Sequence, residues 1–211
     1  MEYRLYAYWR SSCSWRVRIV LSIKHIQYSV EPVNLLEGKQ RESEYSQKNS
    51  MRQVPTLMVG EDFSLTQSLA IMRYLESQHP EPSMLPTDPF VLAKMWEVCE
   101  VINSGTQPLQ NVSVIKRIND VGGDGKQWAK EYIEKGLSSV EKIVSSYSKT
   151  YSFEDYPTLA DACILPQVYN ARRFEIDMNL FPRCQEIAEK LMQIPEVVES
   201  SPDQQPDKPS S

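Results

Sequence analysis

The chain has 211 residues, a formal net charge of −5 and a hydrophobic content of 41%. This composition supports folded domains rather than a disordered chain, and the length suits one large domain or two small ones. An acidic chain lacks the basic footprint that nucleic acid or an anionic membrane requires, and no apolar run approaches the ~20 residues of a membrane span, so we expect neither as a partner.

The four cysteines lie at positions 13, 99, 163 and 184, too far apart to form a CxxC pair. A chain of this length with so few cysteines is typical of a reducing compartment, so we expect free thiols and a cytoplasmic protein. The ordinary role of such a cysteine is that of a small buried hydrophobe, and only Cys13 lies in a context that suggests chemistry. No metal site is expected.

The first eighty residues alternate between strand and helix patterns. The segment from Arg4 to Tyr8 is short and aromatic, as strands are, and residues 15–24 carry apolar side chains at helical spacing. Residues 28–33 predict a second strand, which gives a βαβ unit with a parallel sheet. A hairpin and a helix complete the pattern over residues 56–59, 63–65 and 67–78. We therefore expect an α/β domain over residues 1–80.

A proline-rich linker follows at residues 81–89, because clustered prolines interrupt both helices and central strands. Beyond it only helical patterns recur, which predicts an all-helical domain over residues 90–199 and an overall fold class of α/β plus all-α. The helices are predicted at residues 89 to about 111, 126–146, 158 onward and 182–193. Residues 200–211 hold prolines and charges without an apolar anchor, so we expect a flexible tail.

The strongest chemical signal lies where the first strand turns into the first helix, in the string from Arg10 to Arg18 that reads RSSCSWRVR. The start of a helix leaves amides unpaired and carries partial positive charge, so a thiol placed there ionises more readily. Serine hydroxyls add hydrogen-bond donors to a thiolate. A serine cluster alone would be an ordinary helix cap, but the whole string favours a thiolate site.

Two weaker signals follow along the chain. In Gln53-Val54-Pro55-Thr56 the proline precedes a short strand, where a cis peptide bond can leave the preceding backbone exposed as an edge for an extended peptide ligand. An ordinary strand start is the alternative. Gln67-Ser68 opens a helix, and a hydroxyl with free amides there suits a carboxylate. Plain helix capping is again the alternative.

These motifs occur in the order of a thioredoxin-like domain, and together they resemble the zeta class of the glutathione transferases. Residues Ser11 to Ile19 are similar to the SSCxWRVRIAL signature of that class. Other segments match its pattern in order and spacing, namely Gln53–Leu57, Gln67–Ile71, Gln107–Asn111 and Leu159–Asp161. The resemblance runs from about Tyr3 to about Pro209 and implies the glutathione transferase fold, in which a thioredoxin-like domain precedes a helical bundle domain, in a homodimer.

The resemblance implies glutathione as the cofactor and assigns residues around it. The catalytic group would be Ser11, Ser12 and Cys13, with Ser11 holding the glutathione thiolate. Arg173 matches a family arginine that holds the carboxylate of an acidic substrate, and a solvated charge on a helix face is the alternative. The residues expected to bind the cofactor or line its pocket are Ser14, Trp15, Arg16, Gln40, Val54, Gln67, Ser68, Gln107, Asn111, Val112 and Ser113.

The implied activity is the glutathione-dependent cis-trans isomerisation of maleylacetoacetate in tyrosine and phenylalanine catabolism, with transferase activity on small α-halo acids. Two alternatives stay open, a thiol transferase in which Cys13 is the nucleophile and a non-catalytic paralogue with the same fold. The chain departs from the family pattern at two positions. Ser50 stands where a proline is usual, which should loosen a turn without abolishing binding, and Arg172 stands where an acidic residue is usual, which leaves the substrate preference open.

Overall fold

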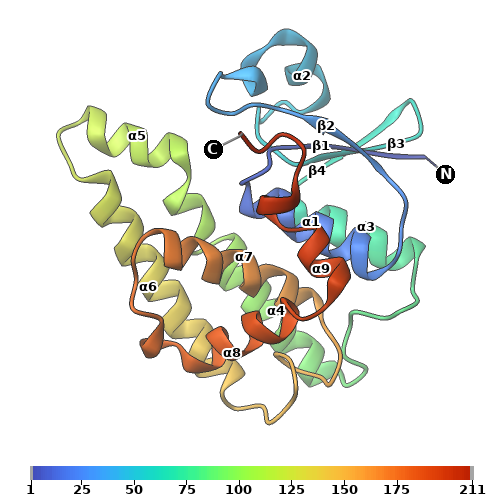
Figure 1. Cartoon of the computed structure of the whole chain (residues 1–211), viewed down its shortest axis with the longest axis vertical. Helices are drawn as coiled ribbons and strands as arrows, with labels where there is room; N and C mark the ends of the chain where they lie inside the picture. Colours follow the sequence, from blue (N-terminus) through green and yellow to red (C-terminus); the bar gives the residue numbers. More distant parts are fainter. Residues whose placement is uncertain (1, 210–211) are drawn as a thin grey trace. The chain divides into compact units, whose positions relative to one another are not determined.

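The computed structural model describes residues 2–209, and the chain divides into two compact units. Unit 1 combines the N-terminal residues up to Ser83 with the chain from Ile194 onward, and unit 2 comprises Met84–Gln193. In Figure 1 the blue beginning and the red end of the chain therefore belong to the same unit. None of the described helices is both long and apolar enough to cross a membrane.

Unit 1 contains a four-stranded mixed sheet. Its strands are β1 (Tyr3–Ala7), β2 (Ser29–Pro32), β3 (Thr56–Val59) and β4 (Phe63–Thr66), in the order β2-β1-β3-β4. The pair β1–β2 is parallel, and the pairs β1–β3 and β3–β4 are antiparallel. This confirms the predicted βαβ unit followed by a hairpin.

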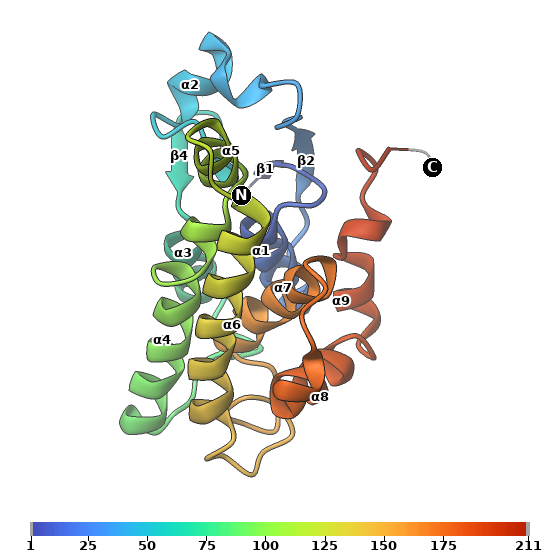
Figure 2. The ribbon, with the colours of Figure 1, turned by 90° about the vertical axis from the view of Figure 1, so that its left-hand side faces the viewer.

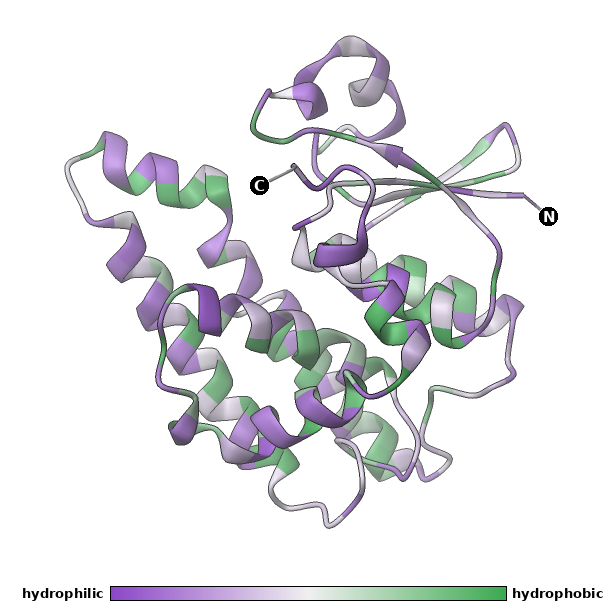
Figure 3. Cartoon of the chain, viewed as in Figure 1, coloured by the Kyte–Doolittle hydropathy of each residue, from purple (hydrophilic) through white to green (hydrophobic). Residues whose placement is uncertain are grey.

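Helices cover both faces of this sheet. Alternate residues of β1 point to opposite sides: Leu5 is fully buried, whereas the ring of Tyr6 lies 5.9 Å from that of Tyr45 in α2 (Ser43–Lys48). Helices α1 (Ser12–Ile23) and α3 (Ser68–Gln78) lie on the face opposite α2 (Figure 1). Figure 3 shows the hydrophobic colour concentrated on α1 and α3 and the hydrophilic colour around α2. The sequence pattern did not predict helix α2.

The end of the chain packs against α1, which corrects the expectation of a flexible tail. Helix α9 (Pro195–Glu199) is followed by the C-terminal segment, which we define as Ser200–Pro209. The Ser200 hydroxyl accepts a hydrogen bond from Trp15 Nε1 over 3.1 Å, and its carbonyl accepts one from Arg18 Nε over 2.8 Å. Residues 210 and 211 of the expected tail lie outside the described residues.

Unit 2 is all-helical. Its helices are α4 (Pro89–Asn103), α5 (Val112–Asp120), α6 (Gly125–Val144), α7 (Leu159–Arg173) and α8 (Pro182–Leu191). The helix predicted over residues 89 to about 111 ends at Asn103, and a 3-10 turn over Gln107–Gln110 separates it from α5. The physical reason is Pro108, because proline has no amide hydrogen to donate to the carbonyl four residues before it and its ring clashes with that carbonyl in a continuing α-helix.

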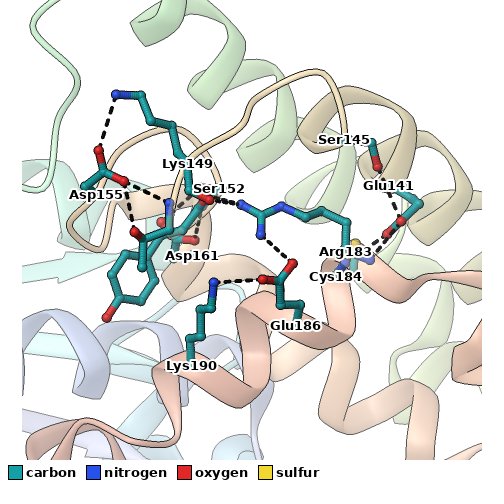
Figure 4. A network of polar contacts seen from close by, with 12 residues as sticks. Glu141, Ser145, Lys149, Ser152, Asp155, Asp161, Arg183, Cys184, Glu186 and Lys190 are labelled. Carbon is teal, nitrogen blue, oxygen red and sulfur yellow. Dashed lines mark hydrogen bonds and ion pairs between the residues drawn. The ribbon is translucent and has the colours of Figure 1, made fainter.

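Two carboxylates accept hydrogen bonds at the starts of α7 and α8 in unit 2, and Figure 4 shows both. Asp161, fully buried near the start of α7, accepts hydrogen bonds from the amides and hydroxyls of Ser152 and Thr158. Glu141 of α6 accepts the amide hydrogens of Arg183 and Cys184, both over 2.9 Å. Side chains therefore satisfy amides that have no partner within their own helices.

Candidate active site

The connection between β1 and α1 places Ser11 at the start of a helix. We call the four residues Tyr8–Ser11 the Trp9 turn, and the Ser11 amide closes it by donating to the Tyr8 carbonyl over 3.0 Å. Ser11 is the N-cap of α1, and its hydroxyl oxygen accepts the Ser14 amide hydrogen over 3.2 Å. Because a hydroxyl that accepts still carries its own proton, Ser11 can donate a hydrogen bond to an anion at the helix start.

The other residues of the serine–cysteine string differ in exposure. Cys13 carries a free, half-buried thiol, and Ser12 is 8% exposed. The side chains of Ser14, Trp15 and Arg16 are buried inside unit 1. Contact of these three with a cofactor stays a prediction, and their burial gives them a part in holding the helix start.

The polar side chain of Asn49 holds the segment before β3 in place. The Val54–Pro55 peptide is cis, as the proline motif favours, and Val54 precedes the first paired residue of the strand. The Asn49 amide group donates to the Gln53 carbonyl over 2.7 Å, and its oxygen accepts the Met51 amide hydrogen over 3.0 Å. Sequence reasoning missed the role of Asn49, which forms the turn even though the family's usual proline at the next position is absent.

The start of α3 holds the other predicted anion-binding pair. Gln67 is exposed and adopts φ 72° and ψ 114°, a conformation that non-glycine residues rarely take and that is concentrated at functional sites. Ser68 is buried, and its hydroxyl accepts a hydrogen bond from Arg16 Nη1 over 3.2 Å. Arg16 thus links the two helix starts that the sequence singled out, because it extends from α1 to the first residue of α3.

Gln40 lies in a 3-10 turn over Lys39–Arg41, at the polar end of the segment between β2 and α2. Its side-chain oxygen is buried and has no hydrogen-bond partner within residues 2–209. A buried acceptor without a partner is uncommon in folded proteins and suits a donor that arrives with a ligand. This observation fits a peptide-like cofactor such as glutathione.

The remaining predicted residues belong to unit 2. Gln107 lies in the 3-10 turn, and Asn111 caps α5 by accepting the Ser113 amide hydrogen over 3.1 Å. Val112 and Ser113 are exposed in the first turn of that helix. The structure therefore brings these four predicted residues together on one short stretch.

Arg173 lies in the last turn of α7. It is exposed, and its Nη1 donates to the Asn170 side-chain oxygen over 3.2 Å. The neighbouring Arg172 forms an ion pair of 3.6 Å with Glu189. That carboxylate offsets the charge that the unusual arginine adds.

A separate cavity of about 400 Å³ lies beside α2 and β2 in unit 1. Its walls include Tyr6, Tyr8, Tyr45 and Asp207, and none of the predicted site residues lines it. Five carboxylates but only two lysines surround it, so its charge disfavours an anionic tripeptide.

Known proteins are similar to this chain over nearly its whole length. Residues 1–77 match the family described as "Glutathione S-transferase, N-terminal domain". Maleylacetoacetate isomerase of Mus musculus is 42% identical over 98% of this chain and 95% of that protein. The zeta-class glutathione S-transferase of Euphorbia esula is 39% identical over 98% of this chain and 93% of that protein.

A solved structure is similar over the whole length. Maleylacetoacetate isomerase from Anaeromyxobacter dehalogenans 2CP-1, with glutathione bound in its active site, has a TM-score of 0.91 and 40% identity, covering 99% of this chain and 98% of that chain. Another structure of that protein, with a TM-score of 0.90, holds dicarboxyethyl glutathione and citrate in the active site. This chain therefore belongs to the glutathione transferase family, in the zeta class that includes maleylacetoacetate isomerase.

Proposed function

We propose that this protein is a glutathione-dependent cis-trans isomerase of maleylacetoacetate. The observation that carries the proposal is the start of α1, where Ser11 caps the helix and keeps a hydroxyl proton to donate. Relatives at about 40% identity over nearly the full chain carry the same activity in their names, and one binds glutathione in its active site.

Bound glutathione supplies a thiolate that adds to the conjugated cis double bond and leaves again after rotation, so that the double bond re-forms as trans. The Ser11 hydroxyl donates to the sulfur, and the positive end of α1 stabilises its charge. Ser12 and Cys13 line the same pocket. Because no residue of the chain accepts a proton from carbon in this scheme, no histidine or aspartate base is required.

The peptide parts of glutathione are held by groups in unit 1. The Val54 backbone pairs with the cysteinyl part, and Gln67 and Ser68 bind the γ-glutamyl carboxylate at the start of α3. Gln40 offers its buried side-chain oxygen to a donor of the tripeptide. These roles rest on the family resemblance and on the helix-start chemistry, which favours anions.

The family resemblance also assigns residues further along the chain. Gln107, Asn111, Val112 and Ser113 contact the cofactor, and Arg173 holds a carboxylate of the substrate through its planar fork of donors. The same thiolate attack would displace halide from small α-halo acids. We further propose a cytoplasmic homodimer that acts in tyrosine and phenylalanine catabolism, and the four free cysteines fit a reducing compartment.

The decisive experiment compares Ser11→Ala with Cys13→Ala in a maleylacetoacetate isomerase assay. If the attacking sulfur belongs to glutathione, Ser11→Ala loses about a hundredfold or more in kcat, the scale of one lost donor to a developing anion, and Cys13→Ala keeps measurable turnover. Ser11→Thr retains a hydroxyl and should restore activity. Ser22→Ala, at the other end of α1, is the matched control.

The opposite result would identify a different enzyme. A dead Cys13→Ala together with an active Ser11→Ala means that Cys13 is the nucleophile, because removal of a covalent nucleophile costs many orders of magnitude. A stable mixed disulfide between Cys13 and glutathione, detected by mass spectrometry, would support that thiol transferase. Absence of all turnover in the unmodified protein would favour a non-catalytic paralogue.

A further inference from the structure

Both backbone polar groups of Trp9 are held by side chains from outside the Trp9 turn. The Trp9 amide donates to Asp207 Oδ2 over 2.9 Å, and its carbonyl accepts a hydrogen bond from Arg18 Nη2 over 2.9 Å. Trp9 is the second residue of the turn, and Ser11 is the fourth. Fixing the peptide planes on either side of Trp9 therefore limits the direction in which the chain enters α1.

Arg18 joins this turn to the end of the chain. Its side chain is fully buried, and its Nε donates to the Ser200 carbonyl over 2.8 Å while Nη2 reaches Trp9. The planar guanidinium keeps these donors in a fixed geometry. Burial lowers the pKa of Arg18 to about 10, opposed by the nearby Tyr28 and Asp207, so the group stays charged at neutral pH.

Hydrogen bonds within the C-terminal segment hold Asp207 in a defined position. Ser201 is buried, and its carbonyl accepts a hydrogen bond from Gln205 Nε2 over 3.0 Å. The Lys208 amide donates to the Gln205 carbonyl over 3.1 Å, which closes a turn around Asp207. Figures 1 and 2 show this red segment running from α9 toward the beginning of α1.

We infer that Asp207 is a positioning residue for the isomerase reaction, acting with Arg18 to fix the Trp9 turn and so the direction of the Ser11 hydroxyl. Asp207 lies 196 positions from Ser11 in sequence and contacts the turn rather than the reacting atoms. The inference rests on the proposed role of Ser11. The carboxylate works here as a hydrogen-bond acceptor for a main-chain amide, a job that an amide oxygen also performs.

This role predicts which kinetic constant changes. Gln67 and Ser68, the proposed anchors of the glutamyl end, lie at the start of α3 and outside the Trp9 turn. Loss of the Asp207 contact should therefore leave glutathione affinity close to that of the parent protein at a pH where the bound thiol is still protonated, since a shift in the thiol pKa changes affinity only where the thiol ionises. It should lower kcat and raise the pH at which the bound thiol ionises, because a misdirected Ser11 donates a weaker hydrogen bond to the thiolate.

The test compares Asp207→Ala and Asp207→Asn with a control in the same segment. Asp203 is exposed, and within residues 2–209 its carboxylate pairs only with Lys208, so Asp203→Ala makes the same chemical change without removing a contact to the Trp9 turn. Calorimetry gives glutathione affinity, ultraviolet absorbance of the bound thiolate gives its ionisation against pH, and the isomerase assay gives kcat. We expect Asp207→Ala to lose about ten- to a hundredfold in kcat, and Asp207→Asn to recover most of that loss.

This design distinguishes failure of the inference, failure of the proposed function and a purely structural role of Asp207. If the parent protein ionises bound glutathione and turns over, but Asp207→Ala matches Asp203→Ala in kcat and in thiol ionisation, the inference is wrong and the proposed function stands. If the parent protein binds glutathione without ionising it, the proposed function itself fails. If Asp207→Ala and Asp207→Asn lose the same fraction of kcat and also have equally lowered melting temperatures, Asp207 has a purely structural role.

Discussion

Ser68 serves two purposes on one hydroxyl. Its oxygen accepts a hydrogen bond from the buried Arg16, which leaves the hydroxyl proton to donate to a carboxylate at the start of α3. The amides of the first helical turn point the same way and favour negative charge. The side chain is therefore both held in place and able to bind.

Replacing Ser68 with alanine should raise the dissociation constant of glutathione by about ten- to a hundredfold, the scale of one hydrogen bond to a charged group. Isothermal titration calorimetry measures this directly. Ser77→Ala is the matched control, since that serine is exposed near the end of the same helix and its hydroxyl donates to the Tyr74 carbonyl. Equal affinity in the two variants would remove Ser68 from the site.

The candidate site residues that the sequence could predict belong to short local motifs. Ser11, Val54 and Ser68 each lie at a strand or helix boundary, where the chemistry follows from the neighbouring residues. Asn49 makes an Asx turn to the Met51 amide, which its residue type could have indicated, whereas no local pattern could have indicated Asp207. For Asp207 the partner amide is 198 residues away.

At the scale of elements, the start of α7 depends on one buried carboxylate. Burial raises the pKa of Asp161, and the four donors from Ser152 and Thr158 oppose that shift because they stabilise the carboxylate. The Thr158–Asp161 pair is a capping box, and it also ties the loop before α7 to the helix. The sequence predicted a helix from residue 158 onward, in agreement with this start.

Asp161→Asn should lower the free energy of unfolding by about 3 kcal/mol, because an amide group turns a donor toward groups that themselves donate. Urea unfolding followed by circular dichroism gives the value. Asp155→Asn is the control: its carboxylate accepts from Thr150 in the same loop but is exposed, so the unfolding midpoint should barely move. A similar midpoint for both variants would contradict the buried role.

Sequence patterns missed α2 and α5 for different reasons. Helix α2 has six residues, of which only Tyr45 is buried, so it is too short to show an apolar stripe, which is the main sequence signal. Helix α5 is amphipathic, but it spans only nine residues and none of them is buried. Helices α6 and α7 bury many side chains and were predicted within about two residues at their starts.

At the scale of the whole molecule, bound glutathione should stabilise the native protein against unfolding. Glutathione near 100 times its dissociation constant stabilises the native protein by about 2.7 kcal/mol. Amide hydrogen exchange measured by mass spectrometry should slow at residues 9–14, 53–56 and 67–69 of unit 1 and at 111–113 of unit 2. Helix α8 serves as the internal control, since no site residue is assigned to it. Protection confined to unit 1 would remove Asn111 and Ser113 from the cofactor site.

The discontinuity of unit 1 has a consequence for how the protein is made. Trp15 and Arg18 leave the ribosome early, but their partner Ser200 is synthesised only after residues 84–193 have been added. At roughly 5–20 residues per second, that wait is on the order of ten seconds. A nascent chain therefore displays the serine–cysteine string long before Asp207 can fix the turn behind it. On this account the enzyme becomes competent only once the C-terminal segment has been synthesised, and fragments released earlier carry the serine–cysteine string without an aligned Ser11.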